Sequence, residues 1–313
     1  MEFAPVESTN KRSGFSIATG GIMRILKEAL IIISRNVKLF SAISLLVFIP
    51  SSLLFLVTQL AMKPQIMIAN FDFDSDNSRL LQHLKRGIIM LCEALMLLAL
   101  SWILSVFSMV STTYASAITY SDQKDLSLRE LLASITRPCK RAAVTWVYIT
   151  LFNMGLVMVV VLVVMLNIYL GLTVLGPSLA ILASVLNVFL TPVWMLGVAV
   201  SVLEEGWYGM RALKKAWDLI TGRKFQGVCL SALVALAMLP VSAIDRWKVE
   251  NGGESMLVPL IWGVLSVAIS VLLQLFAHAA YTVFYYECKG SCGEKVDLEE
   301  KGRYNLIPMS PSR

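Results

Sequence analysis

Charged side chains are scarce in this sequence. Asp, Glu, Lys and Arg make up 15% of its 313 residues, whereas hydrophobic residues make up 57%. A soluble globular domain carries roughly 25% charged residues, so this composition excludes an ordinary soluble domain. The mean hydropathy of +0.72 instead indicates an integral membrane protein.

Residues that usually carry out chemistry are also few. The chain has two histidines, His83 and His278, and its five cysteines form no cluster with histidine or carboxylate at metal-ligand spacing. The sequence therefore predicts no metal and no cofactor. It also lacks a phosphate-binding loop, a dinucleotide fingerprint, a nucleophile elbow and a zinc-protease motif. These absences predict a protein that is not an enzyme.

Long apolar runs, with Glu93 as their one charged residue, are what the sequence does contain. A hydrocarbon core of about 30 Å needs roughly 20 apolar residues in a helix. Six runs qualify, at about residues 40–62, 87–113, 143–169, 177–202, 225–244 and 257–283. Barrel strands would be short and alternating, so we predict an all-α polytopic membrane bundle of six transmembrane helices over residues 20–288. Residues 1–19 and 289–313 are expected to be disordered cytosolic ends.

The basic residues predict the orientation of the chain. Of the 27 Lys and Arg residues, 21 fall in segments on one side of the predicted crossings and 6 on the other. Cytosolic loops carry the excess of Lys and Arg, so both termini are predicted to be cytosolic. Anionic lipid accounts for the net charge of +6, and no nucleic-acid partner is predicted. The absence of a cleavable signal peptide predicts entry at the endoplasmic reticulum, with another endomembrane or the plasma membrane as other destinations.

Amphipathic segments precede the odd-numbered crossings. In the clearest, residues 207–221, one side is polar and the other is apolar, and the polar side carries Arg211, Lys214, Lys215 and Asp218. We expect this helix to lie at the membrane surface, with Trp207 and Trp217 as functional contacts. Similar segments at residues 23–33 and 128–135 suggest three repeats of an interfacial helix plus a transmembrane hairpin. The alternative is that juxtamembrane helices converge on this composition without repetition.

One of these segments also carries a family resemblance. Residues 204–224, EEGWYGMRALKKAWDLITGRK, resemble the signature of uncharacterised plant multi-pass transmembrane proteins. The layout of residues 20–288 is distantly similar to the membrane domain of bacterial glycerophosphoryl diester phosphodiesterases. The catalytic domain of those enzymes has no counterpart in this sequence, so the resemblance implies a membrane architecture and no catalytic residue.

Two ionisable residues fall within the predicted crossings, where such groups are functional candidates. Glu93 interrupts the second run, and His278 lies in the sixth. For Glu93 the alternative is a carboxylate that is protonated or that reaches Lys85 or Arg86. For His278 the alternative is a neutral imidazole ring that is hydrogen-bonded to a neighbouring helix.

Two cysteines follow the sixth crossing on the predicted cytosolic side. Cys288 and Cys292 are candidates for reversible acylation, and the alternative is that both are plain free thiols.

Two functions are compatible with these patterns. The first is noncatalytic membrane organisation, in which the cytosolic-face helices bind membrane lipids or other membrane proteins. The second is a transporter or channel for a small solute, suggested by six crossings that contain Glu93, prolines and amide side chains. The sequence predicts neither the ligand nor the oligomeric state.

Overall fold

The structure is a computed structural model that describes residues 8–69, 77–121, 128–169, 175–251 and 257–292. Within these ranges the chain forms helices and no strand. The helices are α1 (Ser8–Arg35), α2 (Val37–Ala69), α3 (Asn77–Tyr120), α4 (Leu128–Ser134), α5 (Thr136–Tyr169), α6 (Leu175–Leu203), α7 (Met210–Ile220), α8 (Lys224–Asn251) and α9 (Leu257–Ser291). The predicted all-α bundle is therefore confirmed.

Six of these helices are long and apolar enough to cross a bilayer. The candidate spans are Val37–Thr58, Gly87–Tyr120, Thr136–Leu166, Ile181–Leu203, Lys224–Ala243 and Leu260–Ser291. They lie in α2, α3, α5, α6, α8 and α9, so the chain is a multi-pass integral membrane protein. The spans in α3 and α9, of 34 and 32 residues, exceed the roughly 20 residues that the hydrocarbon core requires.

The order of the helices follows the predicted pattern. α1, α4 and α7 each precede a pair of long helices, and the partners α2/α3, α5/α6 and α8/α9 contact each other within each pair. The short helix α4 occupies residues 128–134, inside the amphipathic segment expected there. Along the described chain, a single helix followed by a hairpin of two long helices thus occurs three times.

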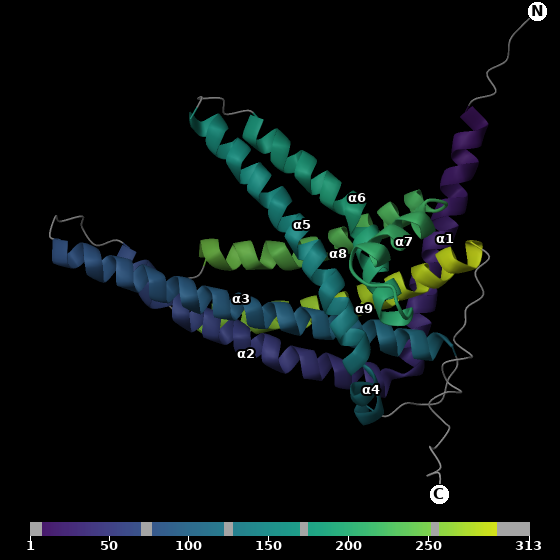
Figure 1. The fold of residues 1–313 in the computed structure, drawn as a ribbon, viewed down its shortest axis with the longest axis horizontal. Coiled ribbons are helices and arrows are strands. Elements are labelled where there is room, and N and C mark those ends of the chain that lie inside the picture. The colour runs from purple at the N-terminus through teal and green to yellow at the C-terminus, as the bar shows by residue number, and fades with distance from the viewer. Residues whose placement is uncertain (1–7, 70–76, 122–127, 170–174, 252–256, 293–313) are drawn as a thin grey trace, which may run out of the picture.

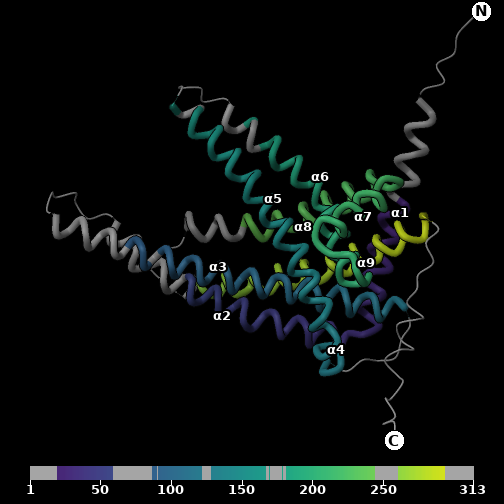
Figure 2. The backbone as a smooth tube through the Cα atoms, viewed as in Figure 1, coloured from purple at the N-terminus to yellow at the C-terminus, as the bar shows by residue number. Residues whose placement is uncertain are grey.

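The three hairpins meet at one end of the molecule and diverge at the other (Figure 1). We call the first the convergent end; it contains α4, α7 and the last three turns of α9. Here α9 is enclosed by other helices, and its residues 279–286 are all buried. The α5/α6 hairpin then leaves the other two pairs, as the backbone trace also shows (Figure 2). Far along α5, Leu151 and Leu162 are 68% and 67% exposed, which leaves them to contact lipid in a bilayer.

Small residues allow the helices of the convergent end to approach closely. A Cβ atom at Gly227 of α8 would lie 3.1 Å from Pro192 of α6 and 3.3 Å from Phe284 of α9. One turn later, Ser231 shares a 2.8 Å hydrogen bond with the hydroxyl of Tyr281. Small residues of α8 therefore face two other helices.

Both ends of the helical region extend further than expected. Helix α1 begins at Ser8, so residues 8–19 are helical although they were predicted to be disordered. Ser, Thr and Asn at positions 8–10 are residue types that favour a helix start. Helix α9 continues to Ser291, past the predicted limit of 288, because ion pairs of Glu287 and Lys289 hold its last turn. Residues 1–7 and 293–313 lie outside the described chain.

Candidate functional site at the convergent end

A partly buried carboxylate joins three helices of the convergent end. Glu204 directly follows the apolar run of α6, and its side chain is 12% exposed. Lys215 of α7 lies 2.7 Å from one carboxylate oxygen, and Lys289 of α9 lies 2.9 Å from the other. Tyr285 donates a 2.7 Å hydrogen bond to that second oxygen. The α6 terminus is thereby fixed to both α7 and α9.

These donors determine the charge state of Glu204. Burial alone would raise the pKa of its carboxyl group. Hydrogen bonds from Lys215, Tyr285 and Lys289 outweigh burial and lower the pKa below the ordinary value of 4.5. Glu204 is therefore ionised at neutral pH and neutralises cations of the cluster.

A second carboxylate joins the amino-terminal helix to the end of the bundle. Glu287 of α9 is 7% exposed and lies 2.7 Å from Arg24 of α1 through one oxygen. Its other oxygen lies 2.7 Å from Arg223, in the turn between α7 and α8. Glu204 and Glu287 together engage four basic side chains of the convergent end.

The turn from α6 to α7 depends on two glycines. Gly206 and Gly209 have φ angles of 84° and 61°, a left-handed conformation that glycine adopts without steric cost. The amide of Gly209 donates a 2.9 Å hydrogen bond to Thr145 of α5. A Cβ atom at Gly209 would lie 3.0 Å from the ring of Tyr148. The turn is thus held against α5 and sets the start of α7.

Helix α7 has one face buried in the bundle. Ala212 and Ala216 are fully buried, and Leu219 and Ile220 nearly so. These side chains are covered by protein, and α6 is the helix that contacts α7 most. Met210 and Trp217, which the amphipathic pattern places on the apolar side, are instead exposed. The surface that α7 presents outward is consequently a mixture of basic and aromatic groups.

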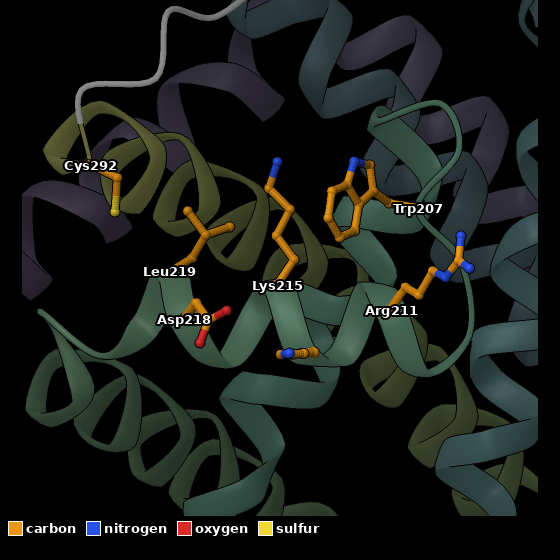
Figure 3. Close-up of a pocket in the computed structure, with 7 residues that line it drawn as sticks. Trp207, Arg211, Lys215, Asp218, Leu219 and Cys292 are labelled. Carbon is orange, nitrogen blue, oxygen red and sulfur yellow. The ribbon is translucent and has the colours of Figure 1, made fainter.

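A groove lies beside α7, between the turn that precedes this helix and the end of α9 (Figure 3). We call it the α7 groove; its volume is about 570 Å³, and it is lined by Trp207, Arg211, Lys214, Lys215, Asp218, Leu219 and Cys292. The ammonium group of Lys215 lies 4.9 Å from the centre of the Trp207 ring, which is a cation–π distance. Cys292 faces these residues from the end of α9. The groove combines cations, a carboxylate and apolar surface within one concavity.

The two tryptophans predicted to be functional both lie on this part of the molecule. Trp207 is 40% exposed and Trp217 is 42% exposed. Trp217 is covered on one side by Lys224, whose ammonium group lies 4.8 Å from its ring centre. Partly exposed indole rings beside lysines are typical of a membrane–water interface.

Glu93 and His278 lie at different depths. The rings of Tyr120 in α3 and Tyr286 in α9 stack at 4.6 Å, which sets the level of the two helices. Glu93 precedes Tyr120 by 27 residues, about 40 Å of helix, whereas His278 precedes Tyr286 by eight residues, about 12 Å. The structure therefore does not bring the two groups together.

The surroundings of these two residues also differ. Glu93 is exposed on α3, and the side chains of its suggested partners, Lys85 and Arg86, lie outside those that the structure describes. The Nδ1 atom of His278 is buried and, among the described residues, has no hydrogen-bond partner. The expected bond from this ring to a neighbouring helix is thus not found at Nδ1.

The two candidate acylation sites differ in access. Cys292 is exposed on the rim of the α7 groove, whereas Cys288 is fully buried in the core. An acyl-transfer enzyme needs an accessible thiol, so in this conformation only Cys292 of the pair meets that requirement. Acylation of Cys292 stays a prediction.

The residues that organise the site were not among those predicted. Their role follows from the contacts that the structure shows for Glu204, Tyr285, Glu287 and Lys289. One sequence signal was available: Glu204 and Glu287 are acidic residues at the ends of apolar helices, within segments that are otherwise rich in Lys and Arg. An acidic group in such a position is a candidate for a charge-neutralising role.

Comparison with known proteins assigns the chain to a family. Residues 15–301 match the family described as a domain of unknown function, DUF8558, and the chain belongs to it. No curated protein and no solved structure matches the chain. The suggested similarities to plant multi-pass proteins and to glycerophosphoryl diester phosphodiesterases receive no support from these comparisons.

Proposed function

We propose that this protein is a noncatalytic membrane organiser that binds lipids or partner membrane proteins through the outward face of α7. The observation that carries the proposal is the division of α7 into two faces. One face is buried against the bundle, with Ala212 and Ala216 fully covered, while Trp217 stays exposed on the other and Trp207 is exposed in the turn before the helix. A helix fixed this firmly presents its exposed groups in a constant geometry, which favours recognition.

We further propose that the convergent end faces the cytosol. α1, α4 and α7 lie there, and the segments around them supply most of the 21 basic residues that the topology places on one side. The anionic lipids of the cytosolic leaflet attract such segments. The membrane in question is the endoplasmic reticulum, another endomembrane or the plasma membrane.

The test removes the two exposed indoles. Trp207→Ala and Trp217→Ala, singly and together, should lower the amount of lipid or protein that co-purifies in polymer-extracted membrane patches, while membrane insertion is retained. Trp262→Ala is the matched control, because Trp262 is 38% exposed on α9, far from α7. Unchanged co-purification in the double variant would contradict the proposal.

A transporter or channel for a small solute is the second candidate. The observation that favours it is a set of buried polar atoms without partners among the described residues: Ser108, Ser111, Ser116, His278 and Tyr286. They belong to α3 and α9, which contact each other, and unpaired polar groups in a membrane bundle favour enclosed water. Liposomes that contain the purified protein would be assayed for proton, ion and metabolite flux. A flux that His278→Ala or Glu93→Gln abolishes would place this function first.

A further inference from the structure

The basic side chains of the convergent end fall into two groups. Lys215 and Lys289 are paired with Glu204, and Arg24 and Arg223 are paired with Glu287. Arg211 and Lys214 are exposed on α7, and within the described part of the chain neither takes part in an ion pair. These two cations are therefore available to an anion from outside the protein.

The position of α7 along the bundle determines which anions it meets. The α6 span ends at Leu203 and the α8 span begins at Lys224, immediately before and after the α7 segment. α7 consequently lies at the level where the hydrocarbon core ends and phospholipid headgroups begin. Trp207 and Trp217, both partly exposed, are suited to this layer. The nearest abundant phosphate is that of the adjoining leaflet.

The α7 groove matches a phospholipid headgroup in size and chemistry. Arg211 and Asp218 are seven residues apart, which is about 10 Å along the helix. Arg211 and Lys214 supply donors for phosphate oxygens, and Asp218 supplies an acceptor for a hydroxyl or amino group of the same headgroup. We infer that the α7 groove binds an anionic phospholipid, with its phosphate at Arg211 and Lys214. This inference rests on the proposed function and names its ligand.

One other occupant is suggested by the sequence itself. The chain that follows Cys292, on the rim of the groove, contains Glu294, Asp297, Glu299 and Glu300. These carboxylates could compete for the same cations, and the lipid is preferred because α7 lies at headgroup level. The experiment separates the two occupants by including a chain that ends at Cys292.

Binding would be measured on the full chain in mixed micelles of phosphatidylcholine with phosphatidylserine or phosphatidylinositol, by native mass spectrometry of the bound lipids. Arg211→Gln with Lys214→Gln should lower bound anionic lipid about tenfold, because each basic contact at a charged surface contributes severalfold. Arg137→Gln with Lys140→Gln is the control, since both residues are exposed in the first turns of α5 and removal changes the net charge equally. The control should change binding less than twofold. Soluble glycerophosphate at millimolar concentration should not displace the lipid.

Three results would overturn the inference. First, the groove variant could bind as much anionic lipid as the unaltered protein does. Second, the groove variant and the control variant could lose anionic lipid equally, which would indicate only a general electrostatic attraction to the basic surface. Third, the groove substitutions could leave lipid binding by the full chain unchanged while the chain ending at Cys292 binds lipid. That result would show that the acidic residues after Cys292 occupy the groove. If the groove variant is unaffected but Trp207→Ala with Trp217→Ala still loses a protein partner, the proposed function stands and the lipid assignment fails.

Discussion

Arg24 and Glu287 are 263 positions apart in the sequence, and their side chains meet at 2.7 Å. The pair closes the first helix of the chain onto the last. Because Glu287 also binds Arg223 at 2.7 Å, a single carboxylate holds α1 and the α7–α8 turn against α9. Together with Glu204, it gives the convergent end a fixed geometry.

Removing the Glu287 charge should destabilise the bundle. Glu287→Gln leaves two arginines without a carboxylate, and we expect a loss of about 1–3 kcal/mol, reduced from the value for a fully buried pair by the exposure of Arg24. Thermal unfolding in detergent measures the change. Arg24→Gln should cost less, because the carboxylate keeps Arg223. Equal midpoints for Glu287→Gln and the unaltered protein would show that these pairs do not support the fold.

Acid should weaken the convergent end through Glu204. Its pKa in the folded protein is lower than the ordinary 4.5, so its ionised form is favoured by folding. The resulting stabilisation is complete above pH 4.5 and is lost as the pH falls through the lower, folded-state value. Unfolding midpoints measured between pH 7 and pH 3 should therefore show a gap between the unaltered protein and Glu204→Gln that narrows on acidification. A gap that stays constant or widens toward low pH would refute this assignment.

The turn before α7 should tolerate no side chain at Gly209. Its φ of 61° opposes alanine, and so does the ring of Tyr148, which would lie 3.0 Å from the added Cβ atom. Gly209→Ala should lower the free energy of unfolding by about 1–3 kcal/mol. Gly222→Ala is the matched control, because a Cβ atom there would meet nothing within 4 Å. Unfolding of both variants at the same temperature would contradict the prediction.

Close packing of α8 gives a further prediction. A Cβ atom at Gly227 would lie 2.9 Å from Ile220 and 3.1 Å from Pro192. Gly227→Ala should destabilise the protein by about 1–3 kcal/mol through overpacking, whereas Gly155→Ala, at an open position on α5, should not. The midpoint of thermal unfolding again provides the measurement, and a Gly227→Ala midpoint as high as that of Gly155→Ala would show that α8 has room to move.

The membrane architecture could be predicted because it depends on local composition. Apolar runs of sufficient length predict the crossings. The amphipathic pattern at residues 128–135 predicted α4, which spans residues 128–134. The site depended on contacts between distant segments. Lys289 meets Glu204 across 85 positions, and no local pattern encodes that distance.

Helix α7 shows where the amphipathic pattern is ambiguous. An apolar face predicts burial, but lipid and protein bury it equally well. Here α6 covers much of that face, and the close approach is made by Gly197, where a Cβ atom would lie 2.7 Å from Leu213. Small residues such as Ala212 and Ala216 in the buried face are the local sign of helix packing.

The proposed role of α7 depends most on which side of the membrane holds the convergent end. In a chain whose native cysteines are replaced by serine, two positions would be labelled separately with a membrane-impermeant maleimide, before and after selective opening of the cytosolic side. They are Lys214→Cys and Asp72→Cys, the second of which lies between the first two spans of the sequence. We predict that Lys214→Cys reacts only from the cytosol and that Asp72→Cys reacts only from the opposite side. Labelling of Lys214→Cys from the lumenal or extracellular side would contradict the central claim.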